Sequence, residues 1–114
     1  MLFKKGLSFS NFPFRVLYLF TQENISPLQS GFTVSAKHFK KAVERNRIKR
    51  LMREAYRLQK SLLSESLQNS GKYLAVFFIY TGNQIPVYED VSEKMQSALK
   101  RLKKIADESS ASNT

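Results

Sequence analysis

Apolar and polar residues alternate near the start of the chain, between Leu7 and Phe20. A repeat of two places side chains on one face of a β-strand, so this segment is expected to form one strand or two. The apolar positions of that face are Phe14, Val16, Tyr18 and Phe20. Turn-forming residues are frequent across residues 21–31, and residues 32–35 (Phe-Thr-Val-Ser) then predict a further strand.

A helical period begins near Ala42 and runs to about Leu63. Apolar residues recur there at steps of three and four, which predicts an amphipathic helix whose apolar stripe covers a sheet. The stripe consists of Ile48, Leu51, Met52, Ala55, Leu58 and Leu62. The sequence Asn69-Ser70-Gly71 is expected to end the helical segment.

An unbroken apolar run from Tyr73 to Tyr80 predicts a central strand with both faces covered. After turn residues around Gly82 and Pro86, a second helical period appears. Its apolar positions are Val91, Met95, Ala98, Leu99, Leu102 and Ile105. Small polar residues dominate from Asp107 to Thr114, so this end is expected to be a frayed, disordered tail.

The composition fits one domain, expected over residues 1–106. The chain has 114 residues, of which 42% are hydrophobic and 12% aromatic, enough for a single core. It contains no cysteine, which excludes disulfides and thiolate chemistry. The apolar run at residues 12–20 is too short to cross a bilayer, and no small-residue cleavage site follows it. We therefore expect a cytoplasmic protein that does not associate with membranes.

The distribution of charge sets this chain apart from an ordinary small domain. The formal net charge is +10, and ten lysines or arginines against two glutamates lie between Lys37 and Lys60, so this segment carries +8. On a helical wheel of about 100° per residue, a cationic arc of about 140° lies opposite the apolar stripe. The arc contains Arg45, Asn46, Lys49, Arg50, Arg53, Arg57 and Lys60. A solvated face and a membrane-surface helix are alternatives, but the uniform sign of the charge favours nucleic acid.

Local rules of helix stability are broken repeatedly in this segment. Like charges at steps of three and four repel one another. Lys40 and Lys41 also stand just before the helix start, where the helix dipole disfavours cations. Because all of these conflicts come from surplus positive charge, they indicate a functional surface.

A specific motif lies within the same segment. It reads Ala42-Val43-x-Arg45-Asn46-Arg47-x-Lys49-Arg50, followed by Arg53-Glu54-Ala55. This pattern resembles the signature of the bacterial ribonuclease P protein family, and the resemblance extends over about residues 3 to 105. It implies an α+β fold, a two-layer α/β sandwich similar to the second domain of ribosomal protein S5. The implied sheet is mixed, with an unusual left-handed βαβ crossover, and the family's N-terminal helix is shortened or absent here.

The resemblance also implies a function. In that family a catalytic RNA performs metal-dependent hydrolysis that removes the 5′ leader of precursor tRNA, and the protein subunit assists without an active site of its own. The implied partners are therefore the catalytic RNA, expected at one protein per RNA, and precursor tRNA. We expect no cofactor or metal ligand on the protein, and magnesium held mainly by RNA phosphates.

The resemblance assigns two groups of site residues. The residues implied to contact RNA are Lys37, Lys40, Lys41, Arg45, Asn46, Arg47, Lys49, Arg50, Arg53 and Arg57. The residues implied to line a cleft for the single-stranded leader are Phe3, Arg15 and Leu17. Ordinary core packing is an equally good explanation for Phe3 and Leu17.

Other functions fit the residues less well. An independent enzyme needs acid–base or nucleophilic groups gathered in a pocket, yet His38 is the only histidine and the nine acidic residues are scattered. A general or ribosomal RNA-binding protein without a processing role is compatible with the charge, and only the motif argues against it. A helix that reads DNA is less favoured, because so cationic a face offers few side chains that discriminate base edges.

Overall fold

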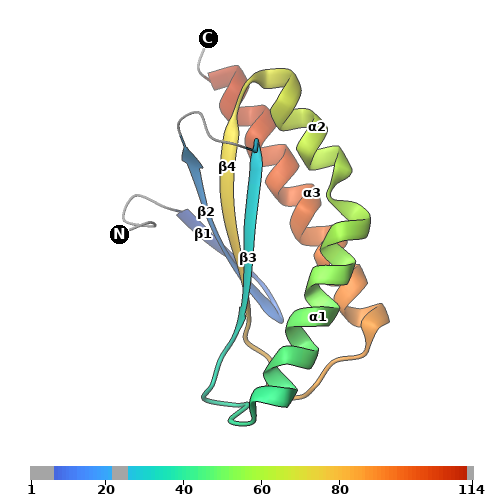
Figure 1. Ribbon diagram of the computed structural model, residues 1–114. Helices are drawn as coiled ribbons and strands as arrows, with labels where there is room; N and C mark the ends of the chain where they lie inside the picture. The colour runs from blue at the N-terminus through green and yellow to red at the C-terminus, as the bar shows by residue number, and fades with distance from the viewer. Residues whose placement is uncertain (1–6, 22–25, 113–114) are drawn as a thin grey trace.

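A computed structural model describes residues 7–21 and 26–112 as a four-stranded sheet with three helices on one face (Figure 1). The elements are β1 (Leu7–Asn11), β2 (Phe14–Thr21), β3 (Leu28–Val34), α1 (Ala42–Gln59), α2 (Ser61–Ser70), β4 (Tyr73–Tyr80) and α3 (Tyr88–Ser112). The strands lie in the order β1-β2-β4-β3. Because β2 is antiparallel to β1 and β4 while β3 is parallel to β4, the sheet is mixed. The predicted two-layer α+β fold is thus confirmed.

The first alternating segment forms a hairpin of two strands. β1 and β2 pair up to Asn11 opposite Phe14, and a cis peptide bond joins Phe12 to Pro13 in the turn. Proline fits there because a turn does not need its missing N–H group. The face predicted from the alternation is confirmed, with three of its residues buried and Phe20 partly buried against the core.

The chain passes from β3 to β4 through α1 and α2. In Figure 1 both strands run downward, the helices lie to their right, and β3 lies nearer to the viewer than β4. Following the chain through the helices from β3 to β4 therefore describes a left-handed turn, against the right-handed default for such units. This crossover places α1 beside β3, which is an edge strand of the sheet.

The core lies between the helices and one face of the sheet. Fully buried side chains come from both layers, including Phe14, Val16 and Phe78 from strands and Ile48, Met52 and Met95 from helices. Along β4, buried and half-buried residues alternate. The prediction that both faces of β4 are covered is wrong for the described part of the chain, because the helices cover one face only (Figure 1). Apolar residues on both sides of this strand conceal its alternation in the sequence.

The long helical segment is divided, and its buried side differs from the predicted stripe. α1 ends at Gln59 and α2 continues to Ser70, where Gly71 adopts a left-handed conformation with φ 69°. Leu58 and Leu62 of the predicted stripe are 58% and 64% exposed, whereas Tyr56 is buried. On a helical wheel, the buried side of α1 is rotated by about 50° from the predicted apolar stripe, toward the cationic arc. The reason is that α1 packs beside edge strand β3, whose Phe32 contacts the Tyr56 ring.

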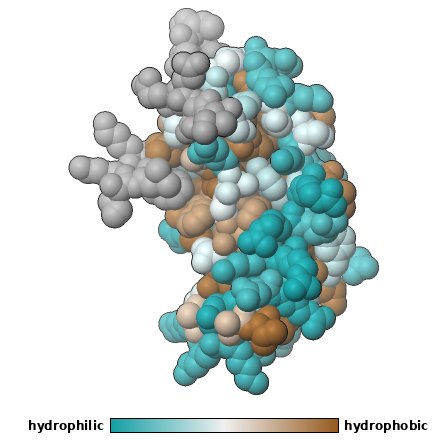
Figure 2. Space-filling view, in the orientation of Figure 1, coloured by the Kyte–Doolittle hydropathy of each residue, from teal (hydrophilic) through white to brown (hydrophobic). Residues whose placement is uncertain are grey.

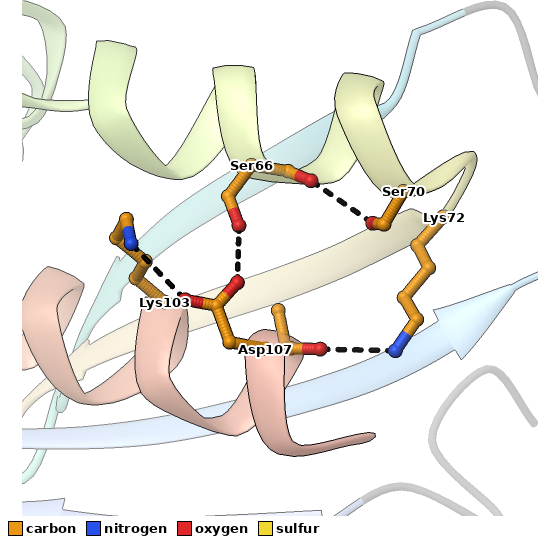
Figure 3. Close-up of polar contacts among 6 residues, drawn as sticks. Ser66, Ser70, Lys72, Lys103 and Asp107 are labelled. Atoms are coloured by element: carbon orange, nitrogen blue, oxygen red, sulfur yellow. Dashed lines mark hydrogen bonds and ion pairs between the residues drawn. The ribbon is translucent and has the colours of Figure 1, made fainter. Parts of the chain in front are cut away.

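The last helix extends further than the composition indicates. α3 continues to Ser112, so the prediction of a disordered tail from Asp107 is wrong for residues 107–112. Figure 3 shows the contacts that hold this end against α2 and the start of β4. Ser66 Oγ donates to Asp107 Oδ1 at 2.5 Å, and Lys103 Nζ lies 3.0 Å from Asp107 Oδ2. Lys72 Nζ donates to the carbonyl oxygen of residue 106 at 2.9 Å.

Two predictions concern the first residues of the chain. The shortened or absent N-terminal helix and the cleft residue Phe3 both fall within residues 1–6, outside the described residues. They stay predictions.

Candidate RNA interface

The loop at residues 35–41 carries three lysines and is fastened to the domain. Phe39 inserts into the core, where its ring centroid lies 6.1 Å from that of Tyr80. Arg45 Nη1, from the first turns of α1, donates to the carbonyl oxygen of Phe39 at 2.7 Å. The first contact fixes the loop to β4 and the second fixes it to α1, so its lysines stand beside that helix at a defined position. All three are exposed: Lys37, Lys40 and Lys41.

The exposed side of α1 carries a continuous series of basic side chains. We call it the cationic face, and it consists of Arg47, Arg50, Arg53 and Arg57, together with Lys60 at the junction of α1 and α2. At about 1.5 Å per residue this face extends for about 20 Å, long enough to meet several successive phosphates. Asn46 is also exposed and lies between its members. Figure 2 shows hydrophilic surface over α1 next to more apolar surface over the sheet.

Arg45 and Lys49 behave differently from the other predicted contact residues. Both are half-buried, because the rotated packing of α1 turns their side of the helix toward the sheet. The guanidinium of Arg45 is occupied by the Phe39 carbonyl oxygen. Arg45 therefore positions the lysine loop in addition to adding positive charge.

A carboxylate stands within the cationic face and pairs with one of its members. Arg57 Nη2 lies 2.7 Å from Glu54 Oε2, and Arg57 Nε donates to Glu54 Oε1 at 3.3 Å. The hydrogen bonds and charge of Glu54 raise the pKa of Arg57 above its ordinary value. Because the pair is exposed, its contribution to folding is small. Its effect is to lower the net charge at this end of the face.

An open groove lies between the cationic face and edge strand β3. We call it the β3-edge groove, a space of about 500 Å³ lined by Ser30, Gly31, Phe32, Arg50, Arg53, Glu54, Tyr56, Arg57 and Lys60. Burial raises the pKa of the Tyr56 hydroxyl, which also shares a hydrogen bond with Ser30 across the groove floor. The sequence pattern does not predict this groove, because nothing local joins a strand residue such as Phe32 to a helix residue about 20 positions later. The aromatic Tyr56 among arginines was the one available signal.

The two leader-cleft candidates among the described residues, Arg15 and Leu17, lie on the other side of the sheet. Arg15 is exposed and Leu17 is half-buried, and both point away from the helices, since their neighbours Phe14, Val16 and Tyr18 fill the core. Phe77 and Ile79 of β4 pair with Leu17 and Arg15, respectively, and are half-buried on the same open face. The structure thus separates these two candidates from the cationic face by the thickness of the sheet.

The described residues contain neither a metal-ligand cluster nor a membrane-spanning helix. Across residues 7–21 and 26–112 no three His, Asp or Glu side chains gather as possible metal ligands. Over the same part of the chain, no helix combines the length and apolar character needed to cross a membrane.

A mixed sheet with helices on one face, bordered by a strongly cationic helix, defines a small basic protein suited to binding polyanions. The particular family follows from comparison with known proteins. The family model for ribonuclease P matches residues 1–103, and the chain belongs to this family of ribonuclease P protein components, subunits of the ribonuclease P endoribonuclease ribonucleoprotein. Membership implies a role in tRNA 5′ processing.

Individual relatives agree with the family model. The ribonuclease P protein component of Porphyromonas gingivalis is 39% identical over 101 residues, which cover 88% of this chain and 74% of that protein. The RNase P protein of Thermotoga maritima, solved with 1-(4-fluorophenyl)-2-thiourea, is 28% identical with a TM-score of 0.67, covering 87% of this chain and 88% of that one. The Staphylococcus aureus RNase P protein is 29% identical with a TM-score of 0.57, covering 90% and 83%.

Proposed function

We propose that this chain is the protein subunit of ribonuclease P and that it binds the catalytic RNA through the cationic face and the lysines of loop 35–41. One observation carries the proposal: in a member of this family, the basic side chains form a single surface whose loop is fixed by the contact of Arg45 with Phe39. Arginine offers a planar fork of donors to phosphate, and Asn46 adds directional hydrogen bonds.

In this proposal the RNA performs the chemistry and the protein supplies binding. Magnesium would be held mainly by RNA phosphates, because hard cations prefer oxygen ligands and RNA supplies them densely. One protein would bind one catalytic RNA, in the cytoplasm. The protein contributes by neutralising phosphates that otherwise repel each other when substrate and catalytic RNA meet.

We further propose that the 5′ leader of precursor tRNA runs along the open face of the sheet, beside Arg15 and Leu17. The half-buried Phe77 and Ile79 support this placement, because bases stack on an aromatic ring and pack on an aliphatic side chain without demanding one sequence. A factor that processes many different tRNAs needs that tolerance. Phe3 would complete the cleft.

The test is cleavage of precursor tRNA at low magnesium, comparing the cognate catalytic RNA alone, the protein alone and the mixture. Cleavage in the mixture only is the expected result. Arg50→Gln should raise the protein concentration needed for rescue. Lys94→Gln, which removes one exposed charge from α3, is the matched control and should change it far less.

The contrary outcome is also defined. If the RNA cleaves at high magnesium and the protein gives no rescue at low magnesium, a general or ribosomal RNA-binding role is the better account. Equal effects of the two substitutions would show that net charge acts without a defined face.

A further inference from the structure

The β3-edge groove combines aromatic surface with positive charge, whereas the rest of the cationic face offers charge without aromatic surface. Its floor is aromatic, made by Phe32 of β3 and Tyr56 of α1, and its rim carries Arg50, Arg53, Arg57 and Lys60. A space of about 500 Å³ is in the range of sites that take small organic ligands. Such a groove suits a ligand that has a flat apolar part and a negative charge.

The aromatic floor is rigid and ends at the surface. The Phe32 ring stacks on the fully buried Phe78 ring, with centroids 5.5 Å apart and planes at 12°. The buried Tyr56 ring meets Phe32 edge-on at 5.4 Å and 72°. Because Phe78 and Tyr56 are held in the core, Phe32 keeps its orientation although it is itself only half-buried. The open side of this stack faces the groove.

A guanidinium group continues the stack on its open side. The Arg53 Cζ atom lies 6.0 Å from the Phe32 ring centroid. Rings and guanidinium planes are the two protein surfaces on which unpaired RNA bases stack. Phe32, backed by Phe78 and bordered by Arg53, thus offers a base a flat surface to lie against.

The rim of the groove selects for a negative partner. Four cations stand around it against one carboxylate, Glu54, which is already paired with Arg57. An anion bound at this rim would be attracted by several cations at once. Phosphates on either side of a stacked base would meet Arg50, Arg57 and Lys60.

We propose that the β3-edge groove binds an unpaired nucleotide of single-stranded RNA, with its base against Phe32 and Arg53 and its flanking phosphates on the rim. The inference rests on the proposed function, because RNA bound along the cationic face would deliver that nucleotide. The site lies on the helix side of β3, opposite the open face assigned to the leader. An acidic peptide that adds a strand to the β3 edge is the competing occupant, and it would need the charge but not the aromatic floor.

The experiment compares two probes of equal length and charge: a five-nucleotide oligoadenylate RNA and the same chain of abasic ribose phosphates. The Arg53 side-chain N–H and the Phe32 ring protons are followed by NMR while each probe is titrated into the full chain. Stacking is worth about 1–3 kcal/mol per base, so the base-bearing probe should bind about 5- to 150-fold more tightly. It should also shift the Arg53 and Phe32 signals, and the abasic probe should not.

Two substitutions test the mechanism separately. Phe32→Leu keeps an apolar side chain on Phe78 but removes the flat ring, and Arg53→Lys keeps the charge but removes the flat guanidinium. Each should abolish most of the preference for the base-bearing probe, and the affinity of each variant for the abasic probe is the reference that shows how much phosphate binding the variant keeps. Thermal unfolding of both variants provides the folding control, and because Arg53 is exposed, Arg53→Lys tests the site even if Phe32→Leu fails to fold.

Three results would overturn the inference. Equal binding of the two probes would reduce the groove to a phosphate surface. A base preference that survives both substitutions would place the stacking elsewhere. A glutamate-rich hexapeptide that shifts the backbone amides of β3 more than the RNA probe does would identify a strand-addition site. Failure of the inference remains distinct from failure of the proposed function, since rescue of precursor tRNA cleavage by the unsubstituted protein is measured independently.

Discussion

Removing the carboxylate of Glu54 should make the protein bind its RNA more tightly. Glu54 stands inside the cationic face and takes two hydrogen bonds from Arg57, at 2.7 and 3.3 Å. Glu54→Gln leaves an amide of nearly the same shape and removes one negative charge. Arg57 is then free to offer its full charge and its donor fork to a phosphate. Folding stability should be almost unaffected, because the pair is exposed and screened by solvent.

The size of the effect follows from the charge that is removed. For a phosphate on Arg57 at about 6 Å from the carboxylate, repulsion in water is about 0.7 kcal/mol, or about threefold in Kd. Salt should suppress the gain, because the Debye length falls from about 10 Å at 0.1 M to about 3 Å at 1 M. We therefore expect tightening that approaches about threefold at very low salt, is about twofold at 0.1 M salt, and nearly vanishes at high salt.

The assay is equilibrium binding of the cognate catalytic RNA across a salt series. Glu65→Gln is the matched control, since it removes the same charge from an exposed position on α2, outside the cationic face. Equal tightening by both variants would mean that only net charge matters. Unchanged affinity for Glu54→Gln would place Arg57 outside the interface, and weaker binding would show that Glu54 holds Arg57 in its binding conformation.

Three further predictions concern the fold. Met52→Ala should lower the free energy of unfolding in urea by about 2–5 kcal/mol, because the Met52 side chain is 0% exposed. Leu58→Ala should lower it by less than about 0.5 kcal/mol, because Leu58 is 58% exposed, and equal losses would contradict the packing of α1. Arg45→Ala should speed amide exchange in loop 35–41, because the Phe39 carbonyl loses its partner; unchanged exchange would refute the anchor. Hydrogen bonds from Ser66 and Lys103 lower the pKa of Asp107 below its ordinary value of 3.8. The unsubstituted chain should therefore be more stable than Asp107→Asn above pH 3.8, and this advantage should fade as the pH falls through the lowered pKa. An advantage that does not change with pH would contradict the contact.

Much of the architecture could be predicted because its signals are local. The alternation around Val16 and the helical period after Val91 depend only on neighbours a few residues apart, and both elements form as expected. The start of α1 at Ala42 and the end of α2 at Gly71 are likewise short-range features, although the break between the two helices at Lys60 leaves no such signal. The motif from Arg45 to Arg53 identified the family before any tertiary contact was considered.

The errors share one cause. Leu58 lies on an apolar stripe by period, yet the side of α1 that is buried depends on how the helix meets β3 and α3. The apolar run of β4 does not reveal that one of its faces stays open. The polar end of α3 gains distant partners because α2 and the start of β4 pass beside it, where Ser66 reaches Asp107 and Lys72 reaches residue 106. Each of these outcomes depends on residues far apart in the chain.

The sequence by itself determined the elements, the concentration of positive charge on one helix and the family, because propensity, period and motif are properties of consecutive residues. Only the tertiary structure decided which way α1 is turned, which places Tyr56 beside Phe32 and Arg45 beside Phe39. Packing against distant strands sets these relations. The hydrophobic effect that drives this packing is non-directional, so the order of residues in the chain does not reveal which surfaces meet.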